Sequence, residues 1–286
     1  MSRRRRIVAF LFLTYALSTI FYVRIASTGK LKMLPVLGLM WCPAAAAVIV
    51  RLVSQRNLHG TGWTWGPTRW QVLSYLLPPA VGIVVYGLVW LVGIGTFTAA
   101  GLRLSNEVSE QIPLPVTIAL LATAGVLSGA VFALGEEVGW RGFLVPELAQ
   151  VTSFRNTALI SGAAWAVYHY PLILFGNYSG GVPTWFALPV FTWMVLASSF
   201  VYAWLRLKSG SVWTGVIAHA SHNLFIQQIF DPLTTDHRLT TYVTTEFGVG
   251  LALAYTILAI YFWRRRGEVV VPLPSSEPNP DGALHG

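Results

Sequence analysis

The chain has 286 residues, of which 55% are hydrophobic and only 10% are charged. Soluble domains carry about 25% charged residues, so most of this surface is not built to face water. The net charge is +8, and the one cysteine, Cys42, excludes a disulfide framework and a cysteine-based zinc site.

Apolar segments follow one another along the whole chain, each long enough to cross the roughly 30 Å hydrocarbon core of a bilayer. The first follows Arg3–Arg6 as in a signal peptide, but it lacks a convincing small-residue cleavage site, so we expect it to be retained. We predict an all-α, polytopic transmembrane helical bundle of about eight spans, at 7–25, 34–53, 71–95, 115–135, 156–175, 184–205, 211–230 and 247–263.

Basic residues are divided unevenly between the two sides of these spans. With a cytoplasmic N-terminus, all of the 19 Lys and Arg lie on the cytoplasmic side except Arg24, Lys30, Lys32, Arg103 and Arg238. This matches the positive-inside rule with both termini cytoplasmic. The positive charge then faces anionic lipid, so we expect a multi-pass protein of the cell membrane that contacts the lipid bilayer and no nucleic acid.

The domain organisation follows from the same pattern. Residues 1–267 are predicted to form a single transmembrane domain. The segment 268–286 is rich in Pro, Ser, Asn and Gly, and is predicted to be a disordered cytoplasmic tail.

Two adjacent carboxylates, Glu136 and Glu137, stand near the cytoplasmic end of the fourth predicted span. They point about 100° apart around a helix, and Glu137 shares a face with Arg141, so those two can pair. Glu136 is then free, and a desolvated carboxylate can serve as a general base. A plain ion pair at the helix end would explain the same residues.

Two later spans carry histidines. His169 follows Trp165 by four residues, so the indole would pack on the same helix face and fix the imidazole. A satisfied packing histidine is the alternative there. His219 and Asn223 share a face of the seventh span, with His222 within one turn, and these three are hard to explain as packing alone.

Ionisable groups are costly at membrane depth, so we expect these side chains from three spans to converge in one cavity. Such a cavity would suit hydrolysis, with a base for water and donors for an oxyanion. The alternative is a metal, since Glu136, His169 and His219 form a plausible zinc set with an open position for water. The spacing differs from the HExxH of soluble zinc proteases, which weakens the metal hypothesis.

The three groups also follow the motif order of a known family. Glu136–Arg141 has the spacing EExxxR, Trp165–His169 resembles FxxxH with Trp in place of Phe, and His219–Asn223 has the spacing HxxxN. Over about residues 115–230 the chain therefore resembles the CAAX protease and bacteriocin-processing (CPBP) family of intramembrane peptidases, which includes the type II CAAX-prenyl endopeptidases. The first three spans share with that family only their nature as membrane helices.

This resemblance implies a catalytic core at about 115–230 in an intramembrane endopeptidase acting on membrane-associated or lipidated peptides or proteins. It implies that Glu136 and His169 activate water, and that His219 and Asn223 hold the oxyanion. The supporting residues would be Glu137, Arg141, Trp165 and His222. The sequence leaves open the physiological substrate, prenyl specificity and whether a divalent metal such as zinc takes part.

Two other functions stay open. A catalytically silent scaffold, immunity protein or chaperone could share the fold, although such a relative could lose any member of the polar set, which is intact in this chain. A transporter could use the polar set as a proton or ion path, although no internal repeat supports this.

Overall fold

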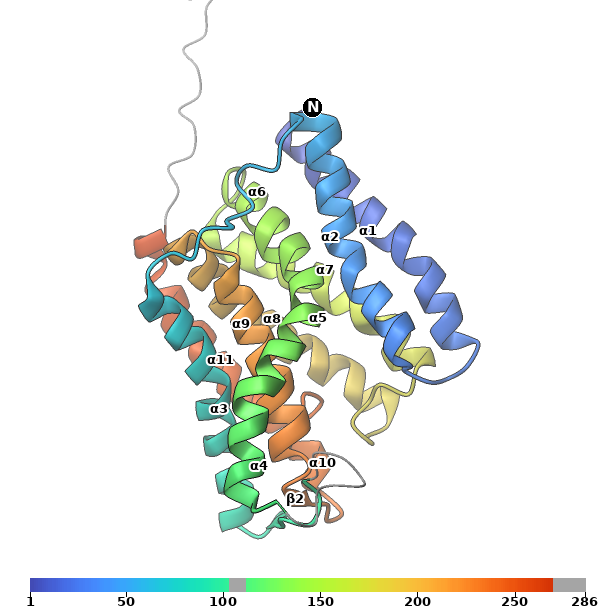
Figure 1. The fold of residues 1–286 in the computed structure, drawn as a ribbon, viewed down its shortest axis with the longest axis vertical. Coiled ribbons are helices and arrows are strands. Elements are labelled where there is room, and N and C mark those ends of the chain that lie inside the picture. The colour runs from blue at the N-terminus through green and yellow to red at the C-terminus, as the bar shows by residue number, and fades with distance from the viewer. Residues whose placement is uncertain (103–111, 270–286) are drawn as a thin grey trace, which may run out of the picture.

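The computed structural model describes residues 1–102 and 112–269 (Figure 1). These residues are helical apart from loops and one antiparallel pair of two-residue strands, β1 (Thr96–Phe97) and β2 (Thr234–Thr235), which confirms the predicted all-α class. The helices are α1 (Arg3–Ala26), α2 (Met33–Gln55), α3 (Thr68–Leu91), α4 (Leu114–Leu120), η2 (Leu121–Gly125), α5 (Val126–Gly139), η3 (Trp140–Leu144), α6 (Val145–Ala149), α7 (Phe154–Phe175), α8 (Thr184–Ser209), α9 (Trp213–His222), η4 (Asn223–Phe230), α10 (Thr240–Val243), α11 (Val249–Arg264) and η5 (Arg266–Val269).

Six of the described helices are long and apolar enough to cross a membrane: α1, α2, α3, the continuous helix Leu114–Ala149, α7 and α8. The seventh predicted span coincides with α9 and η4 together, and the eighth with the shorter apolar helix α11. The count of eight spans and the cytoplasmic side of the termini therefore stay predictions. Most of the predicted tail lies outside the described residues, while Glu268 and Val269 form part of η5.

The fourth span extends well beyond its predicted bounds of 115–135. The helix runs without a break from α4 to α6, over 36 residues. Glu136 and Glu137 therefore lie in the interior of a long helix, so the prediction that they stand near its end is wrong, while the side of the membrane stays a prediction. The polar residues do not end the helix because they are buried against groups from other helices, as described below.

Helix α5 lies between α2 on one side and α9 on the other, and its C-terminal part, from Gly135, is buried (Figure 1). Two glycines allow α2 to approach closely. A Cβ atom on Gly135 would lie 2.6 Å from the carbonyl oxygen of Met40, and one on Gly139 would overlap the Cβ of Pro43. Small residues four positions apart are a common means of close helix packing in membranes. This contact brings Glu136 against the rest of the bundle.

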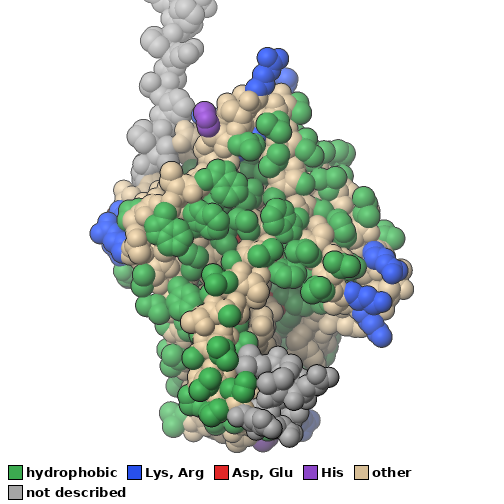
Figure 2. Space-filling model, viewed as in Figure 1, with side chains coloured by type: hydrophobic (Ala, Val, Ile, Leu, Met, Phe, Trp, Pro, Cys, Tyr) green, Lys and Arg blue, Asp and Glu red, His purple; other side chains and the backbone are tan. Residues whose placement is uncertain are grey.

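The outer surface is strongly apolar. Figure 2 shows hydrophobic side chains spread over the face, with Lys and Arg side chains confined to its margins. Large exposed side chains include Val8, Phe12, Leu91, Leu127 and Trp185. A surface of this extent has no counterpart in soluble monomers and indicates a multi-pass membrane protein.

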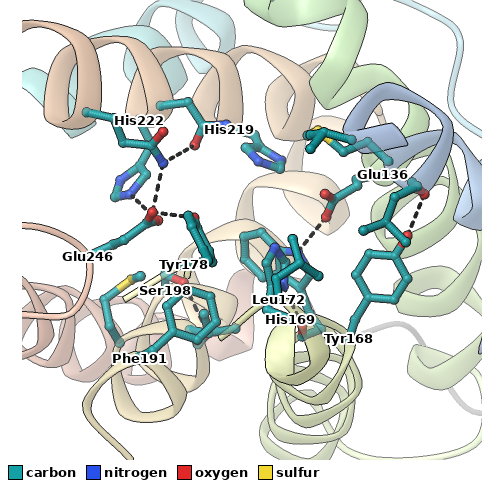
Figure 3. Close-up of a pocket in the computed structure, with 18 of the residues that line it drawn as sticks. Glu136, Tyr168, His169, Leu172, Tyr178, Phe191, Ser198, His219, His222 and Glu246 are labelled. Carbon is teal, nitrogen blue, oxygen red and sulfur yellow. Dashed lines mark hydrogen bonds and ion pairs between the residues drawn. The ribbon is translucent and has the colours of Figure 1, made fainter. Parts of the chain in front are cut away.

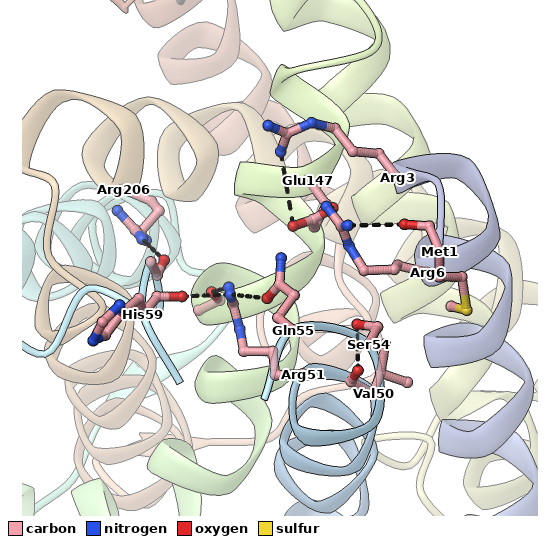
Figure 4. Close-up of polar contacts among 12 residues, drawn as sticks. Met1, Arg3, Arg6, Val50, Arg51, Ser54, Gln55, His59, Glu147 and Arg206 are labelled. Carbon is pink, nitrogen blue, oxygen red and sulfur yellow. Dashed lines mark hydrogen bonds and ion pairs between the residues drawn. The ribbon is translucent and has the colours of Figure 1, made fainter. Parts of the chain in front are cut away.

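Three buried arginines bind the C-terminal part of the long helix (Figure 4). We call Arg6, Arg51, Arg206 and their carboxylate partner Glu147 the arginine cluster. The π-helical turn η3 displaces the regular backbone bonds just after Glu137. Arg51 donates to the carbonyl oxygen of Gly142 at 3.1 Å, and Arg206 donates to that of Arg141 at 2.8 Å. Side chains from α2 and α8 thus satisfy carbonyl groups of the turn.

Candidate active site

A cavity of about 360 Å³ lies among α2, α5, α7, α8 and α9 (Figure 3). All four predicted catalytic residues line it, as do Trp165 and His222. Glu137 and Arg141 do not line the cavity; both are buried behind the residues that do. The structure therefore brings together the polar side chains of three predicted spans.

Glu136 is 1% exposed and is held by two indole groups. Its Oε2 accepts hydrogen bonds from Trp165 Nε1 at 2.7 Å and from Trp140 Nε1 at 3.2 Å. Its Oε1 accepts none from the described residues, and no Lys or Arg among them pairs with it. One oxygen is thus fixed while the other is free to contact a water molecule in the cavity.

Glu137, one residue later, has the opposite environment. Its Oε1 accepts from Arg141 at 2.8 Å, which confirms the predicted pair, and from His219 Nδ1 at 3.0 Å. Because a carboxylate only accepts, Nδ1 of His219 carries its hydrogen, and Nε2 is left for the cavity. The carboxylate also stabilises positive charge on the imidazole, which would allow Nε2 to carry a second proton.

His169 is oriented by its own helix. Its Nδ1 lies 2.9 Å from the backbone oxygen of Trp165, which can only accept, so Nδ1 donates and Nε2 is an acceptor. The two rings meet edge to face at 6.1 Å, as predicted for packing on one helix face. No pattern in the sequence indicates that the same indole also binds Glu136, because that contact joins α7 to α5.

Asn223 is the first residue of η4, a π-helical segment like η2 and η3, and His222 directly precedes it. The Oδ1 of Asn223 accepts a hydrogen bond from Gln227 Nε2 at 3.5 Å, which leaves the amide nitrogen of Asn223 to donate elsewhere. His222 Nδ1 pairs with the hydroxyl of Tyr255 at 2.9 Å. Short π-helices are frequent at functional sites, and among the described residues η3 and η4 begin within two of the three motifs, at Trp140 and Asn223.

Sequence reasoning did not identify Glu246, Gln227, Tyr178 and Tyr255, which also line the cavity. Glu246 was overlooked because it precedes α11 by only a few residues and belongs to no motif. A signal was nonetheless present, since an acidic residue directly before an apolar segment is costly to bury without a role.

The predicted metal ligands do not form a metal centre in this geometry. Among the described residues, no three His, Cys, Asp or Glu side chains are grouped closely enough to hold a metal ion. Glu136, His169 and His219 line the cavity, and each keeps one ligating atom free, because the hydrogen bonds of both imidazoles use Nδ1, as in many metal sites. The three side chains are nonetheless not close enough to share one metal ion, so they do not fit a zinc site in this structure, and the participation of a metal stays a hypothesis.

Comparison with known proteins bears on the central part of the chain. Residues 115–225 match the model of a family described as "Type II CAAX prenyl endopeptidase Rce1-like". The family resemblance is confirmed over this segment. A curated relative, "CAAX prenyl protease 2" of Methanococcus maripaludis, is 30% identical over 94 residues, which are 31% of this chain and 34% of the relative. The chain thus aligns with about a third of the length of that relative.

The Rce1-like segment contains the three motifs and the four cavity residues predicted to be catalytic. It ends shortly after Asn223. Gln227 and Glu246, which complete the cavity on the other side, lie beyond it.

Proposed function

We propose that this protein is an intramembrane endopeptidase of the cell membrane, with both termini cytoplasmic, that hydrolyses membrane-associated or lipidated peptides or proteins. The observation that carries the proposal is Glu136, a buried carboxylate that pairs with no cation among the described residues. One of its oxygens is fixed by indoles and the other is free toward a cavity. The Rce1-like match over residues 115–225 supports the same reaction class.

The reaction uses the chain's own groups. Glu136 and the acceptor Nε2 of His169 orient a water molecule, and Glu136 takes its proton as the water oxygen attacks the peptide carbonyl carbon. Donors from His219 Nε2 and the Asn223 amide stabilise the oxyanion. When the C–N bond breaks, the protonated carboxyl group gives its proton to the leaving amine.

Burial assists each step. The cavity walls are mostly apolar and aromatic side chains, so charge on the oxyanion is poorly screened and gains more from fixed donors than it would in water. Glu137 and Arg141 hold His219 from behind and do not touch the substrate. We expect both to act as positioning residues.

Glu136→Gln tests the proposal. The purified full chain is reconstituted in vesicles and incubated with a pool of lipidated and unlipidated peptides, and fragments are measured by mass spectrometry. Because general base catalysis contributes about 10²–10⁴-fold, we expect cleavage to fall by about 10³-fold with unchanged thermal unfolding. The matched control is Glu268→Gln, at an exposed carboxylate outside the cavity.

Full activity of the Glu136→Gln variant would remove the proposed base. Wild-type vesicles that yield no fragments would favour the silent scaffold, and peptide-independent proton or ion flux would favour the transporter. Exhaustive chelation addresses the metal: activity lost on chelation and restored by zinc would overturn a mechanism that relies on the chain's own groups alone.

A further inference from the structure

A second carboxylate, Glu246, faces the cavity from the side opposite Glu136 (Figure 3). It lies in the turn before α11 and is 7% exposed. The hydroxyl of Tyr178 donates to its Oε1, and so does Gln227 Nε2 at 2.9 Å. These two neutral donors fix the carboxylate in place without neutralising its charge.

No Lys or Arg among the described residues pairs with Glu246, and its one ion-pair contact is with His222. The carboxylates of Glu137 and Glu147 each accept from an arginine at 2.8 Å. In contrast, none of the described residues that line the cavity is Lys or Arg. A buried carboxylate without a cation beside it costs free energy as an anion, and a cationic group of a ligand would remove that cost at Glu246.

Unused polar atoms point to the same place. The Oε2 of Glu246 lies 3.9 Å from His222 Nε2, too far for a hydrogen bond. His222 Nε2 is buried and has no hydrogen-bond partner among the described residues. An oxygen and a nitrogen therefore face one gap, which a ligand with several N–H donors could enter.

Aromatic rings surround this part of the cavity. Tyr178 and Phe191 both line it, and each packs on Phe247, with ring centroids 5.0 and 5.3 Å apart. Carboxylates combined with aromatic rings favour ammonium and guanidinium groups through charge and cation–π attraction. Burial raises the pKa of Glu246 to about 7. A bound cation would lower that pKa again and favour the ionised carboxylate near neutral pH.

The same rings connect this side of the cavity to the proposed catalytic residues. The ring of His169 lies 6.2 Å from that of Tyr178 and 5.2 Å from that of Phe191. Tyr178 therefore contacts both His169 and Glu246, and links the two parts of the cavity. An extended peptide covers about 3.3 Å per residue, so one substrate can occupy both places.

We propose that Glu246, together with Tyr178, Gln227 and His222, forms a subsite for a cationic side chain of the peptide substrate, a lysine ammonium or an arginine guanidinium, within a few residues of the scissile bond. The inference rests on the proposed endopeptidase function and adds the substrate class to it. The same carboxylate disfavours an acidic side chain at that position.

Matched peptide sets test the subsite. Each peptide is acetylated and amidated, and carries Lys, norleucine or Glu at one scanned position. For the wild type we expect kcat/KM for Lys to exceed that for norleucine by at least about tenfold at one position, since hydrogen bonds to charged groups are the stronger ones. In Glu246→Gln, which keeps the shape and the acceptor for Tyr178, we expect this ratio to fall to about one.

Two further variants sharpen the result. Glu246→Asp retains the charge and should retain a preference for Lys, while the exposed Glu268→Gln should leave the ratio unchanged. An equal loss of cleavage for Lys and norleucine peptides in Glu246→Gln would mean a purely structural role, and would overturn the proposal. So would a wild type that cleaves both peptides equally well at every scanned position.

Failure of the endopeptidase function itself gives a different result. If the wild type cleaves none of the peptides, direct binding replaces kinetics, with fluorescent Lys and norleucine peptides titrated against the wild type and Glu246→Gln in detergent micelles. Tighter binding of Lys peptides only when Glu246 is present would support the subsite without peptidase activity. Equal binding of all peptides would refute it.

Discussion

The arginine cluster and the cavity around Glu136 are both buried and polar, but they differ in how far the protein satisfies their polar groups (Figures 3 and 4). Most guanidinium nitrogens of the arginine cluster have a protein acceptor, with the buried Nε of Arg51 as an exception. In the arginine cluster, Arg206 donates to three carbonyl oxygens and Arg6 donates twice to the carboxylate of Glu147. In the cavity, Oε1 of Glu136 accepts no hydrogen bond from the described residues. His222 Nε2 likewise has no hydrogen-bond partner there.

This difference separates stability from function. Polar groups satisfied by the protein contribute to a unique fold, whereas groups left open toward a cavity cost stability and are expected where a ligand completes them. Arg141 takes part in both arrangements, because its side chain pairs with Glu137 while its carbonyl oxygen accepts from Arg206. A substitution at Arg206 should therefore mainly lower the stability of the fold, and a substitution beside Glu137 should mainly lower the catalytic rate.

The largest effect on stability is expected from Arg206→Met. The variant leaves the carbonyl groups of Gly60, Thr61 and Arg141 without their donor. Unsatisfied buried polar groups cost about 1–3 kcal/mol each, so we expect the free energy of unfolding to fall by about 3 kcal/mol. Denaturant titration in micelles, followed by tryptophan fluorescence, measures this change.

Lys208→Met, two residues later on the same helix, is the control. Its ammonium group pairs with Glu268 at a partly exposed position, so the change should stay below about 1 kcal/mol. Equal effects of the two substitutions would show that the carbonyl bonds of Arg206 do not stabilise the fold.

The next effect is expected from Gly215→Ala, on the face of α9 that meets Glu137. A Cβ atom there would overlap Glu137 Oε2, so the carboxylate must move. Since Glu137 orients His219, we expect kcat/KM to fall by about 100-fold, the effect of misplacing a group by about 1 Å, with little loss of stability. Gly87→Ala, in open space on α3, is the control and should leave the rate unchanged. An unchanged rate in Gly215→Ala would contradict the positioning role of Glu137.

Much of the fold could be predicted from the sequence, because apolar segments of membrane length are a strong signal. That signal failed at the fourth span, where Glu136 and Glu137 interrupt the apolar run but not the helix. Nor could the π-helical turn η3 be predicted, since the carbonyl groups that it displaces are satisfied by Arg51 and Arg206 from distant helices.

The site shows the same limit. Motif spacing indicated the pair of Glu137 with Arg141 and the packing of Trp165 on His169, which are contacts within one helix. Contacts between helices, such as the bond from Trp165 to Glu136, depend on the packed structure and have no local sequence pattern. Glu246 stands directly before an apolar segment, which is a local signal, but only the fold shows that its side chain reaches the cavity.

The smallest effect is expected from Trp165→Phe, which places in this chain the residue that the family motif has. The aromatic ring is retained, but the 2.7 Å hydrogen bond to Glu136 Oε2 is lost, and only the 3.2 Å bond from Trp140 remains. A less firmly held base should lower kcat by about tenfold with KM nearly unchanged, because the loss affects the transition state more than substrate binding. Trp193→Phe, which removes an indole bond to Thr256 at a distance from the cavity, should leave kcat unchanged.

If Trp165→Phe is fully active, the indole is only a packing residue and the open oxygen of Glu136 is positioned by its helix alone. If both variants lose activity equally, indole bonds stabilise the bundle in general, and the contrast between a stabilising cluster and a catalytic cavity would no longer apply to Trp165.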